Sequence, residues 1–249
     1  MGDLQRREFH EALLESAAQI VALLAAAAEL DRGSRADRQH VNRRAQLATL
    51  IFAGLRISEF LALRWRDVDL AGGWLTVRDS KTDAGRRKVK IRPVLRDVLL
   101  RLRADYPDAG QDAYVFGTAH GKPQNASNVR SRVLTKAVER ANERLQEAGE
   151  VPLPTLTPHG LRRSFASLLY GIGEPPPNVM AELGHTDPSL ALAIYAAAMR
   201  RDDGENQRLR ALVEGSDLGG LVTSDHSEAP AKANSHDARL PESRSTSGV

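Results

Sequence analysis

Helix-type hydrophobic spacing runs along most of the chain and changes to a strand-type pattern once, between Asp67 and Ile91. In that interval, two short segments rich in apolar and β-branched residues flank a polar turn: Trp74-Leu75-Thr76-Val77 comes before it and Arg87-Lys88-Val89-Lys90-Ile91 after it. Such a pair predicts a hairpin. Asp67 and Asp69 are interpreted as turn residues. The pattern therefore predicts an α+β protein that is mostly α, with one small antiparallel β-sheet.

The helices are predicted from apolar residues that recur every three or four positions. Glycine commonly ends a helix, so Gly54 is expected to stop the second one. Thr157-Pro158 and Asp187-Pro188 each combine a capping residue with a proline suited to the first helical position. These pairs locate the starts of two predicted helices more closely. The predicted helices are 4–30, 37–52, 58–63, 94–104, 126–148, 158–170, 177–183, 188–199 and 203–213.

The composition of the 249 residues excludes several classes of protein. Cysteine is absent, so a disulfide framework and a thiolate zinc site are both excluded. The longest apolar run, residues 20–28, is much shorter than the roughly 20 residues that a membrane span needs. No charged segment with a cleavage site opens the chain. We expect a soluble, non-secreted protein of the cytoplasm, with no membrane partner.

Charge is distributed unevenly along the sequence. Residues 214–249 hold six acidic and three basic side chains, which leaves 32 basic and 26 acidic residues before them. This last segment also loses hydrophobic periodicity and is rich in Ser, Gly, Asp and Ala, so we expect a disordered acidic tail. The basic remainder suits a polyanionic partner, although many proteins that bind no nucleic acid have a similar excess.

Four residues between Thr157 and Tyr195 are candidates for a phosphate site. His159 would lie in the first turn of a helix, where free backbone N–H groups and the helix dipole favour an anion. Arg162, three residues later, would present its planar fork from the same face. His185 would follow the glycine that ends the next helix, and Tyr195 would lie on the helix after that. The alternative for each residue alone is structural: a helix cap, a surface ion pair or core packing.

Two further candidates lie upstream. Arg56 falls in the break between two predicted helices, and Glu59, three residues later, could hold it as a preorganised anion ligand. Taken alone, this pair is equally a structural ion pair. Lys81 lies at the tip of the predicted hairpin, where a single lysine is ordinarily solvated surface. Lys81 is a candidate only in combination with the other candidate residues.

The predicted helix 126–148 carries a basic stripe with a four-residue repeat. Its members, which are candidate DNA contacts, are Arg132, Lys136, Arg140 and Arg144. The alternative is a solvated face, because Glu139, Glu143 and Glu147 offer neighbouring ion pairs worth only a few tenths of a kcal/mol. The sequence favours neither interpretation.

Taken together, these segments resemble the catalytic domain of the tyrosine recombinases, the phage integrase family. The resemblance covers about residues 40–200 and follows the family order and approximate spacing. Its elements are Gly54-Leu55-Arg56-Ile57-Ser58-Glu59, Ser80-Lys81-Thr82, His159-Gly160-Leu161-Arg162-Arg163, Leu183-Gly184-His185 and Tyr195. It implies the tyrosine recombinase catalytic-domain fold over residues 1–213. A type IB topoisomerase would share much of the site, but the Leu-Gly-His element and the short chain favour the recombinase.

The resemblance also implies a role for each candidate. Tyr195 would be the nucleophile, and Arg56 and Arg162 the two phosphate-binding arginines. Lys81 would be the general acid, while His159 would help to remove the proton of the tyrosine, and His185 completes the site. The reaction would be cleavage and rejoining of DNA strands through a 3′-phosphotyrosyl link. The arginines would neutralise charge that a metal ion neutralises in many phosphoryl-transfer enzymes, so no metal or other cofactor is expected.

Family members usually carry a separate helical core-binding domain, and only 55 residues precede Arg56 here. We therefore expect that domain to be absent. The resemblance implies double-stranded DNA as partner and a homotetramer on DNA, and the short chain suggests an accessory protein as well. Two functions stay open: a DNA strand-exchange enzyme, and a truncated or decayed integrase that acts only as a DNA-binding or accessory protein.

Overall fold

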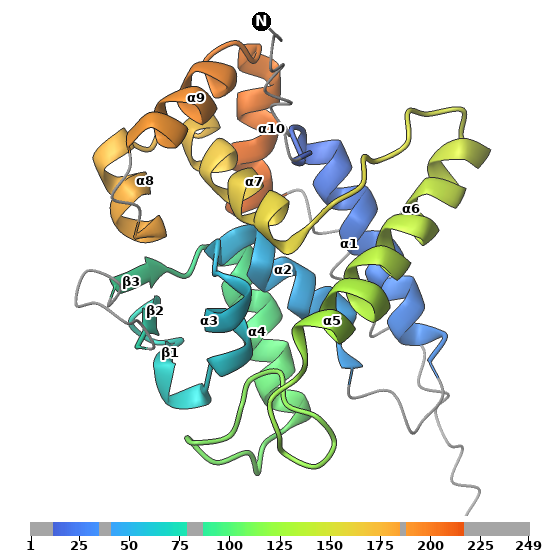
Figure 1. Ribbon diagram of the computed structural model, residues 1–249, viewed down its shortest axis with the longest axis vertical. Helices are drawn as coiled ribbons and strands as arrows, with labels where there is room; N and C mark the ends of the chain where they lie inside the picture. The colour runs from blue at the N-terminus through green and yellow to red at the C-terminus, as the bar shows by residue number, and fades with distance from the viewer. Residues whose placement is uncertain (1–11, 35–40, 79–86, 185–187, 217–249) are drawn as a thin grey trace, which may run out of the picture.

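The computed structural model describes residues 12–34, 41–78, 87–184 and 188–216. Within these ranges, helices surround a central helix, and a small antiparallel sheet lies to one side (Figure 1). The predicted class, mostly α with one small antiparallel sheet, is confirmed. The larger helices are α1 (Ala17–Arg32), α2 (Arg43–Ala53), α4 (Pro93–Asp105), α6 (Lys136–Glu147), α7 (Pro158–Gly171), α8 (Pro176–Leu183), α9 (Pro188–Ala198) and α10 (Asp203–Val213).

Helix α2 occupies the centre of the fold and leads directly into the site described below. Every residue from Ala45 to Ala53 is buried, and the helix packs against α1, α4 and α7. A helix that buries its whole circumference needs its polar side chains satisfied internally. Thr49 meets this need by donating a hydrogen bond to the carbonyl oxygen of Ala45 (2.9 Å). The helix begins at Arg43 and ends, as predicted, at Gly54, while the predicted start at residue 37 lies outside the described residues.

The sheet contains three strands in the order β1 (Val68–Asp69), β2 (Trp74–Val77) and β3 (Arg87–Lys90), all antiparallel. The predicted hairpin is the β2–β3 pair, in which Val77 lies opposite Arg87. The interpretation of Asp69 as a turn residue was incomplete, because it pairs with Trp74 in β1. Side chains alternate along β3, so Arg87 is buried while its neighbour Lys88 is exposed.

The first helix begins later than predicted. Residues 12–15 are not helical, and α1 starts at Ala17 after Ser16, whose hydroxyl accepts a hydrogen bond from the backbone N–H of Gln19. The Gln19 side chain accepts from the backbone of Ser16 in return, which completes a capping box. The predicted start at residue 4 lies outside the described residues.

The predicted helix 126–148 is helical throughout but not uniformly α. A short helix, α5 (Ala126–Asn128), passes into a π-helical segment, Val129–Thr135, before α6 begins. The hydroxyl of Thr135 donates to the carbonyl oxygen of Arg130, five residues earlier (3.0 Å). Helix α6, which follows this segment, packs extensively against α1.

The C-terminal helices build a layer over α7 (Figure 1). The Thr157 hydroxyl caps α7 by accepting from the N–H of Gly160 (2.9 Å), as the sequence predicts. The short α3 (Ile57–Ala62) and α10 also form where they are expected, and α10 packs on α1, α4 and α7. The predicted tail beyond residue 216 lies outside the described residues. None of the described helices has the length and apolar character to cross a membrane.

Residues 12–14 lie along α7, and this contact depends on a glycine. The backbone N–H of Leu14 donates to the Ser164 hydroxyl (2.7 Å), and a Cβ atom added at Gly160 would lie 2.4 Å from the carbonyl oxygen of Ala12. That separation is too short for a non-bonded contact with backbone, which cannot rotate away as a side chain can. Gly160 therefore allows the segment to approach the helix closely.

Gly160→Ala is expected to destabilise the protein by about 1–3 kcal/mol, because the added methyl group overpacks this contact. Helix propensity alone predicts the opposite sign. The measurement is the urea midpoint at constant slope. Gly33→Ala is the matched control, since the nearest atom to its added Cβ lies 3.5 Å away. Equal stability of the two variants would contradict the close approach.

Candidate active site

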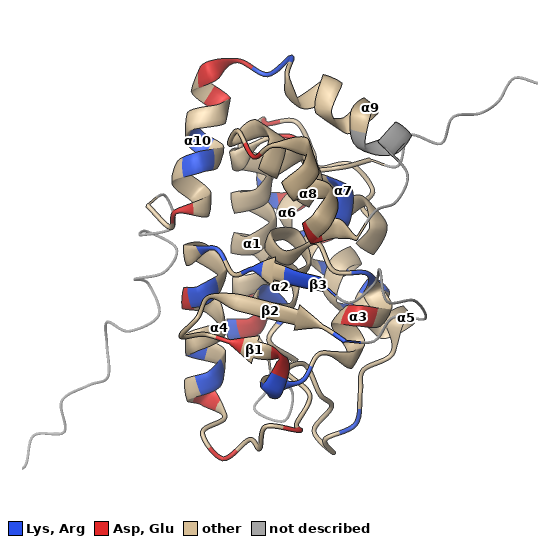
Figure 2. Ribbon diagram, turned by 90° about the vertical axis from the view of Figure 1, so that its left-hand side faces the viewer, with Lys and Arg blue, Asp and Glu red and all other residues tan. Residues whose placement is uncertain are grey.

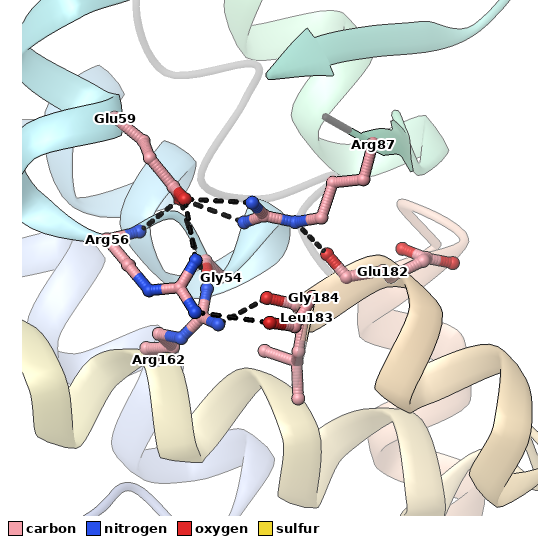
Figure 3. A network of polar contacts seen from close by, with 8 residues as sticks. All are labelled: Gly54, Arg56, Glu59, Arg87, Arg162, Glu182, Leu183 and Gly184. Carbon is pink, nitrogen blue, oxygen red and sulfur yellow. Dashed lines mark hydrogen bonds and ion pairs between the residues drawn. The ribbon is translucent and has the colours of Figure 1, made fainter. Parts of the chain in front are cut away.

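Four charged side chains meet where α3, β3 and α7 approach one another, and we call them the arginine cluster. Its members are Arg56, Arg87 and Arg162, with the carboxylate of Glu59 between them (Figure 3). Two of these arginines were predicted as phosphate ligands from the sequence. Arg87 was not, because its role depends on facing inward from a strand.

Arg56 is positioned by the start of α3. It lies at the N-cap with an extended backbone, and its own N–H donates to Glu59 Oε2 (2.7 Å). Its side chain turns back to the same carboxylate, with 2.9 Å between Nη1 and Oε1. The side chain remains 45% exposed. Arg56 is therefore both preorganised and accessible to an anion from solvent.

Arg162 is positioned by α7 and by two chain turns. Only 2% of its side chain is exposed. Its Nη1 donates to the carbonyl oxygen of Gly54 (2.5 Å), and its Nη2 donates to that of Leu183. Its Nη1 also lies 4.0 Å from Glu59 Oε2. Burial lowers the pKa of the Arg162 guanidinium to about 9, and the charges of Arg56 and Arg87 act in the same direction. It stays protonated at neutral pH.

Glu59 joins the arginines. Arg87 donates to both of its oxygens, at 2.8 Å each, and Arg56 donates to it from backbone and side chain. Burial alone would raise the pKa of Glu59, but the hydrogen bonds from Arg87 and Arg56 outweigh it and hold the pKa at about 2. The carboxylate is ionised throughout the physiological range. Three guanidinium groups and one carboxylate leave two positive charges in excess, which favours an anion.

Two glycines allow the backbone to close around the cluster. Gly54 has a φ of 56°, and a Cβ atom added there would lie 2.2 Å from the ring of Phe165. Gly184, which ends α8, has a φ of 62°, and its carbonyl oxygen accepts from Arg56 Nη2 (3.2 Å). Both conformations are ones that side-chain-bearing residues rarely adopt. The cluster is thus held by backbone carbonyls that these turns present.

His159 lies in the first turn of α7, directly after Pro158, and is exposed. The sequence predicts that it shares a face with Arg162, yet the two differ sharply in exposure, because Arg162 is covered by the turns at Gly54 and Leu183. Lys81 and His185 lie outside the described residues. His185 follows Gly184 directly in the sequence, and Lys81 lies six residues before Arg87.

Tyr195 lies on α9 and is half-buried. Its ring packs edge-to-face against Tyr170 of α7, with 5.2 Å between the ring centroids and 84° between the planes. Its hydroxyl makes no hydrogen bond with another described residue. The sequence of α9 contains no charged residue, and Ile194 and Ala198 on this helix are buried. In Figure 2 the described part of α9 is accordingly tan. Leu192 on this helix is 67% exposed, and Met199, directly after its end, is 49% exposed.

The basic stripe begins with Arg132 on the π-helical segment and continues along α6, where Arg140 and Arg144 share an acidic partner on α1 that the sequence analysis missed. Arg140 Nη2 lies 2.6 Å from Glu29 Oε1, and Arg144 Nε lies 2.8 Å from Glu29 Oε2. The hydrogen bond from Arg140 lowers the pKa of Glu29. Lys136 pairs with Glu139 within the helix (2.6 Å). The stripe thus has a structural use, and its contact with DNA stays a prediction.

Comparisons with known proteins agree with the family resemblance seen in the sequence. Residues 16–201 match the model of the phage integrase family. An integrase/recombinase of Escherichia coli is 31% identical over 176 residues, which cover 59% of this chain and 52% of that protein. The tyrosine recombinase XerC of Xanthomonas campestris pv. campestris (strain B100) is 33% identical over 146 residues, 58% of this chain and 41% of that protein. The chain thus spans about half the length of these curated relatives, or less.

A solved structure shows the same fold. The Tn1549 transposon integrase in complex with a circular intermediate DNA superposes with a TM-score of 0.60 and 22% sequence identity. The superposition covers 83% of this chain and 68% of that one. The described architecture is therefore that of tyrosine recombinase catalytic domains, as the resemblance in sequence implies.

Proposed function

The chain belongs to the phage integrase family, and we propose that it cleaves and rejoins DNA strands as a site-specific recombinase with Tyr195 as nucleophile. The observation that carries the proposal is the arginine cluster. It brings Arg56 and Arg162 together from segments more than 100 residues apart in the sequence and leaves an excess of positive charge. A DNA phosphate is the anion that suits a recombinase of this family.

The proposed cleavage step is a transesterification. The Tyr195 hydroxyl oxygen attacks a backbone phosphorus, its proton passes to His159, and a 3′-phosphotyrosyl bond forms. The bond from phosphorus to the 5′ oxygen breaks, and Lys81 protonates the departing oxygen to give a 5′-hydroxyl. A general acid of this kind typically contributes about 10²- to 10⁴-fold in rate. His185 completes the set of phosphate ligands.

Arg56 and Arg162 neutralise the non-bridging oxygens as negative charge develops on them. Because two fixed guanidinium groups perform this task, the proposed mechanism uses no metal ion. Rejoining is the reverse reaction, in which a 5′-hydroxyl attacks the phosphotyrosyl bond and releases Tyr195. No water takes part, so the energy of the phosphodiester bond is retained.

We propose double-stranded DNA as the partner and assembly of the chain into a tetramer on it, following the family resemblance. The related transposon integrase was solved with DNA. The excess of 32 basic over 26 acidic residues before residue 214 supports the same partner through long-range attraction. An accessory protein that adds to the grip on DNA is a further proposed partner.

The decisive experiment does not require a known target sequence. The full chain is incubated with a library of nicked duplexes whose sequence is randomised around the nick, so that the cleaved end diffuses away and the covalent intermediate accumulates. Adducts are recovered on a denaturing gel, and their DNA is sequenced. We expect an adduct enriched in one sequence. Its absence over the whole library would reject strand cleavage and leave the DNA-binding alternative.

The α6 stripe provides a separate prediction about DNA affinity. If Arg140 and Arg144 contact phosphates, Arg140→Ala/Arg144→Ala is expected to reduce the slope of log affinity against log salt by about two. The slope is measured by fluorescence anisotropy with the recovered DNA between 50 and 200 mM salt, conditions in which phosphate contacts dominate.

Glu29→Gln is the matched control for this pair. It breaks the ion pairs to both arginines but keeps their charges. We expect it to lower stability as the double variant does, while the salt slope stays at the wild-type value. A slope unchanged in the double variant would show that these arginines serve only the contact between α1 and α6.

A further inference from the structure

Arg87 has no part in the reaction described above, yet it is the most fully engaged member of the arginine cluster. Its side chain is 5% exposed, and its two terminal nitrogens donate to the two oxygens of Glu59 at 2.8 Å. Its Nε donates to the carbonyl oxygen of Glu182 (2.6 Å). All three guanidinium nitrogens of Arg87 thus donate to protein oxygens of Glu59 and the α8 turn. Any contribution of Arg87 must act through its partners.

The charge balance shows what Arg87 contributes. Without it, the Glu59 carboxylate would stand against Arg56 and Arg162 alone, and one of their two positive charges would be neutralised. Arg87 supplies the opposite charge for Glu59 in a bidentate pair, which leaves two positive charges for a ligand. The pentavalent transition state of phosphoryl transfer carries about two negative charges, one more than the diester. Loss of one positive charge from the cluster is therefore expected to weaken binding of the transition state more than binding of the DNA substrate.

Arg87 also holds the chain turn that closes the cluster. Its Nε bond to Glu182 fixes the last turn of α8, whose next two carbonyls accept from Arg162 and Arg56 (Figure 3). A Cβ atom added at Gly184 would lie 3.1 Å from Arg87 Cδ, so the turn packs directly on the stem of the arginine. One side chain therefore connects β3, α3 and the end of α8.

Resting on the proposed function, we propose that Arg87 is a positioning residue of the strand-cleavage site. It holds the Glu59 carboxylate and the α8 turn so that Arg56 and Arg162 keep their charge and orientation for a DNA phosphate.

A set of charge variants tests the proposal in the full chain. Arg87→Met is expected to slow adduct formation on the recovered nicked DNA by on the order of 10- to 100-fold at saturating DNA, the size of effect typical when a residue that orients ligand-binding groups is lost. Adding Glu59→Gln removes the uncompensated carboxylate and restores two positive charges. The double variant is expected to regain most of the lost rate. A double variant no faster than Arg87→Met overturns the charge role.

Arg92→Met is the matched structural control. Arg92 is also buried, and it forms a bidentate pair with Glu182 of α8 at 2.7 and 2.9 Å, but it makes no contact with Glu59. Its loss removes a comparable ion pair from the same helix. We expect Arg92→Met to lower stability and leave the rate at saturating DNA within about threefold of wild type. An equal loss of rate in both variants would reduce Arg87 to a structural residue and overturn the proposal.

Binding of inorganic phosphate separates this inference from strand cleavage. Calorimetry at low ionic strength in a phosphate-free buffer is expected to show weaker phosphate binding in Arg87→Met than in wild type, by about tenfold, and no change in Arg92→Met. If wild type forms no adduct but this difference appears, the proposed reaction fails and the positioning of the anion site stands. Equal phosphate binding in wild type and Arg87→Met overturns the inference.

Discussion

Tyr195→Phe is expected to abolish the covalent protein–DNA adduct, a loss of more than about 10³-fold that reaches the detection limit of the gel. The hydroxyl oxygen is the atom that forms the bond to phosphorus, and phenylalanine has no replacement for it. The ring packs edge-to-face on Tyr170, and phenylalanine keeps that contact. The variant is therefore expected to fold like wild type and to retain its affinity for intact DNA, which isolates the chemical step.

Tyr170→Phe is the control for this experiment. Its ring touches that of Tyr195, and its hydroxyl is buried with no hydrogen-bond partner among the described residues. Burial raises the pKa of the Tyr170 phenol, which disfavours its use as a nucleophile. Tyr170→Phe is expected to form the adduct at the wild-type rate. An adduct that persists in Tyr195→Phe and disappears in Tyr170→Phe would show that Tyr170 is the nucleophile and would overturn the assignment of Tyr195.

Glu59→Gln is expected to cost about 3 kcal/mol of stability at pH 7. The pKa of Glu59 falls from 4.5 to about 2 on folding, because its hydrogen bonds with Arg87 and Arg56 outweigh the cost of burial. A depressed pKa contributes stability above the unfolded value, and that contribution disappears as pH falls through the folded value. The difference between wild type and variant is therefore expected to be constant above about pH 5 and to shrink from there toward pH 2. Urea unfolding at a series of pH values measures it.

Glu139→Gln is the control for the acid dependence. Its ion pair with Lys136 is exposed on both sides, and such pairs contribute about 0–1 kcal/mol. We expect this variant to unfold within about 0.5 kcal/mol of wild type at every pH. A stability difference for Glu59→Gln that does not change between pH 5 and pH 2 would contradict the ionised carboxylate at the centre of the cluster.

Local signals predicted the helix ends that are marked by caps. Thr157 with Pro158 and the glycine at 54 determine their boundaries within a few residues, so α7 begins and α2 ends where they were expected. The start of α1 was missed although Ser16 and Gln19 form a capping box, because apolar spacing before Ser16 continues the helical pattern. Residues 12–14 are instead held away from a helix by their contact with α7.

The elements that escaped prediction have weak or misleading local signals in the sequence. Strand β1 has two residues, too few to show alternation, and exists only through its pairing with β2. The π-helical segment 129–135 keeps the apolar spacing of an α-helix and so leaves no local trace. Arg87 resembles a solvated strand residue until the sheet places it inward. The alternation of Arg87, Val89 and Ile91 was the one signal that could have identified it.

The convergence of Arg56 and Arg162 was predictable from the sequence, but the geometry of the cluster was not. Arg56 and Arg162 were chosen by residue type, order and resemblance, and they do converge. The electrostatic centre, Glu59, was noted only as a partner of Arg56, because its bonds with Arg87 cross from one element to another. The same limitation hid Glu29, whose pairs with Arg140 and Arg144 connect separate helices.

The partners that complete the arginine cluster lie far apart in the sequence, and this separation determines when the cluster can form during synthesis of the chain. Arg162 reaches back 108 residues to Gly54, and Arg56 reaches forward 128 residues to Gly184, so the cluster needs the end of α8. Closing loops of this length has an entropic cost that only a nearly complete fold repays. A nascent chain on the ribosome therefore lacks the assembled anion site until residue 184 has emerged. Until then the chain presents its arginines only as separate charges.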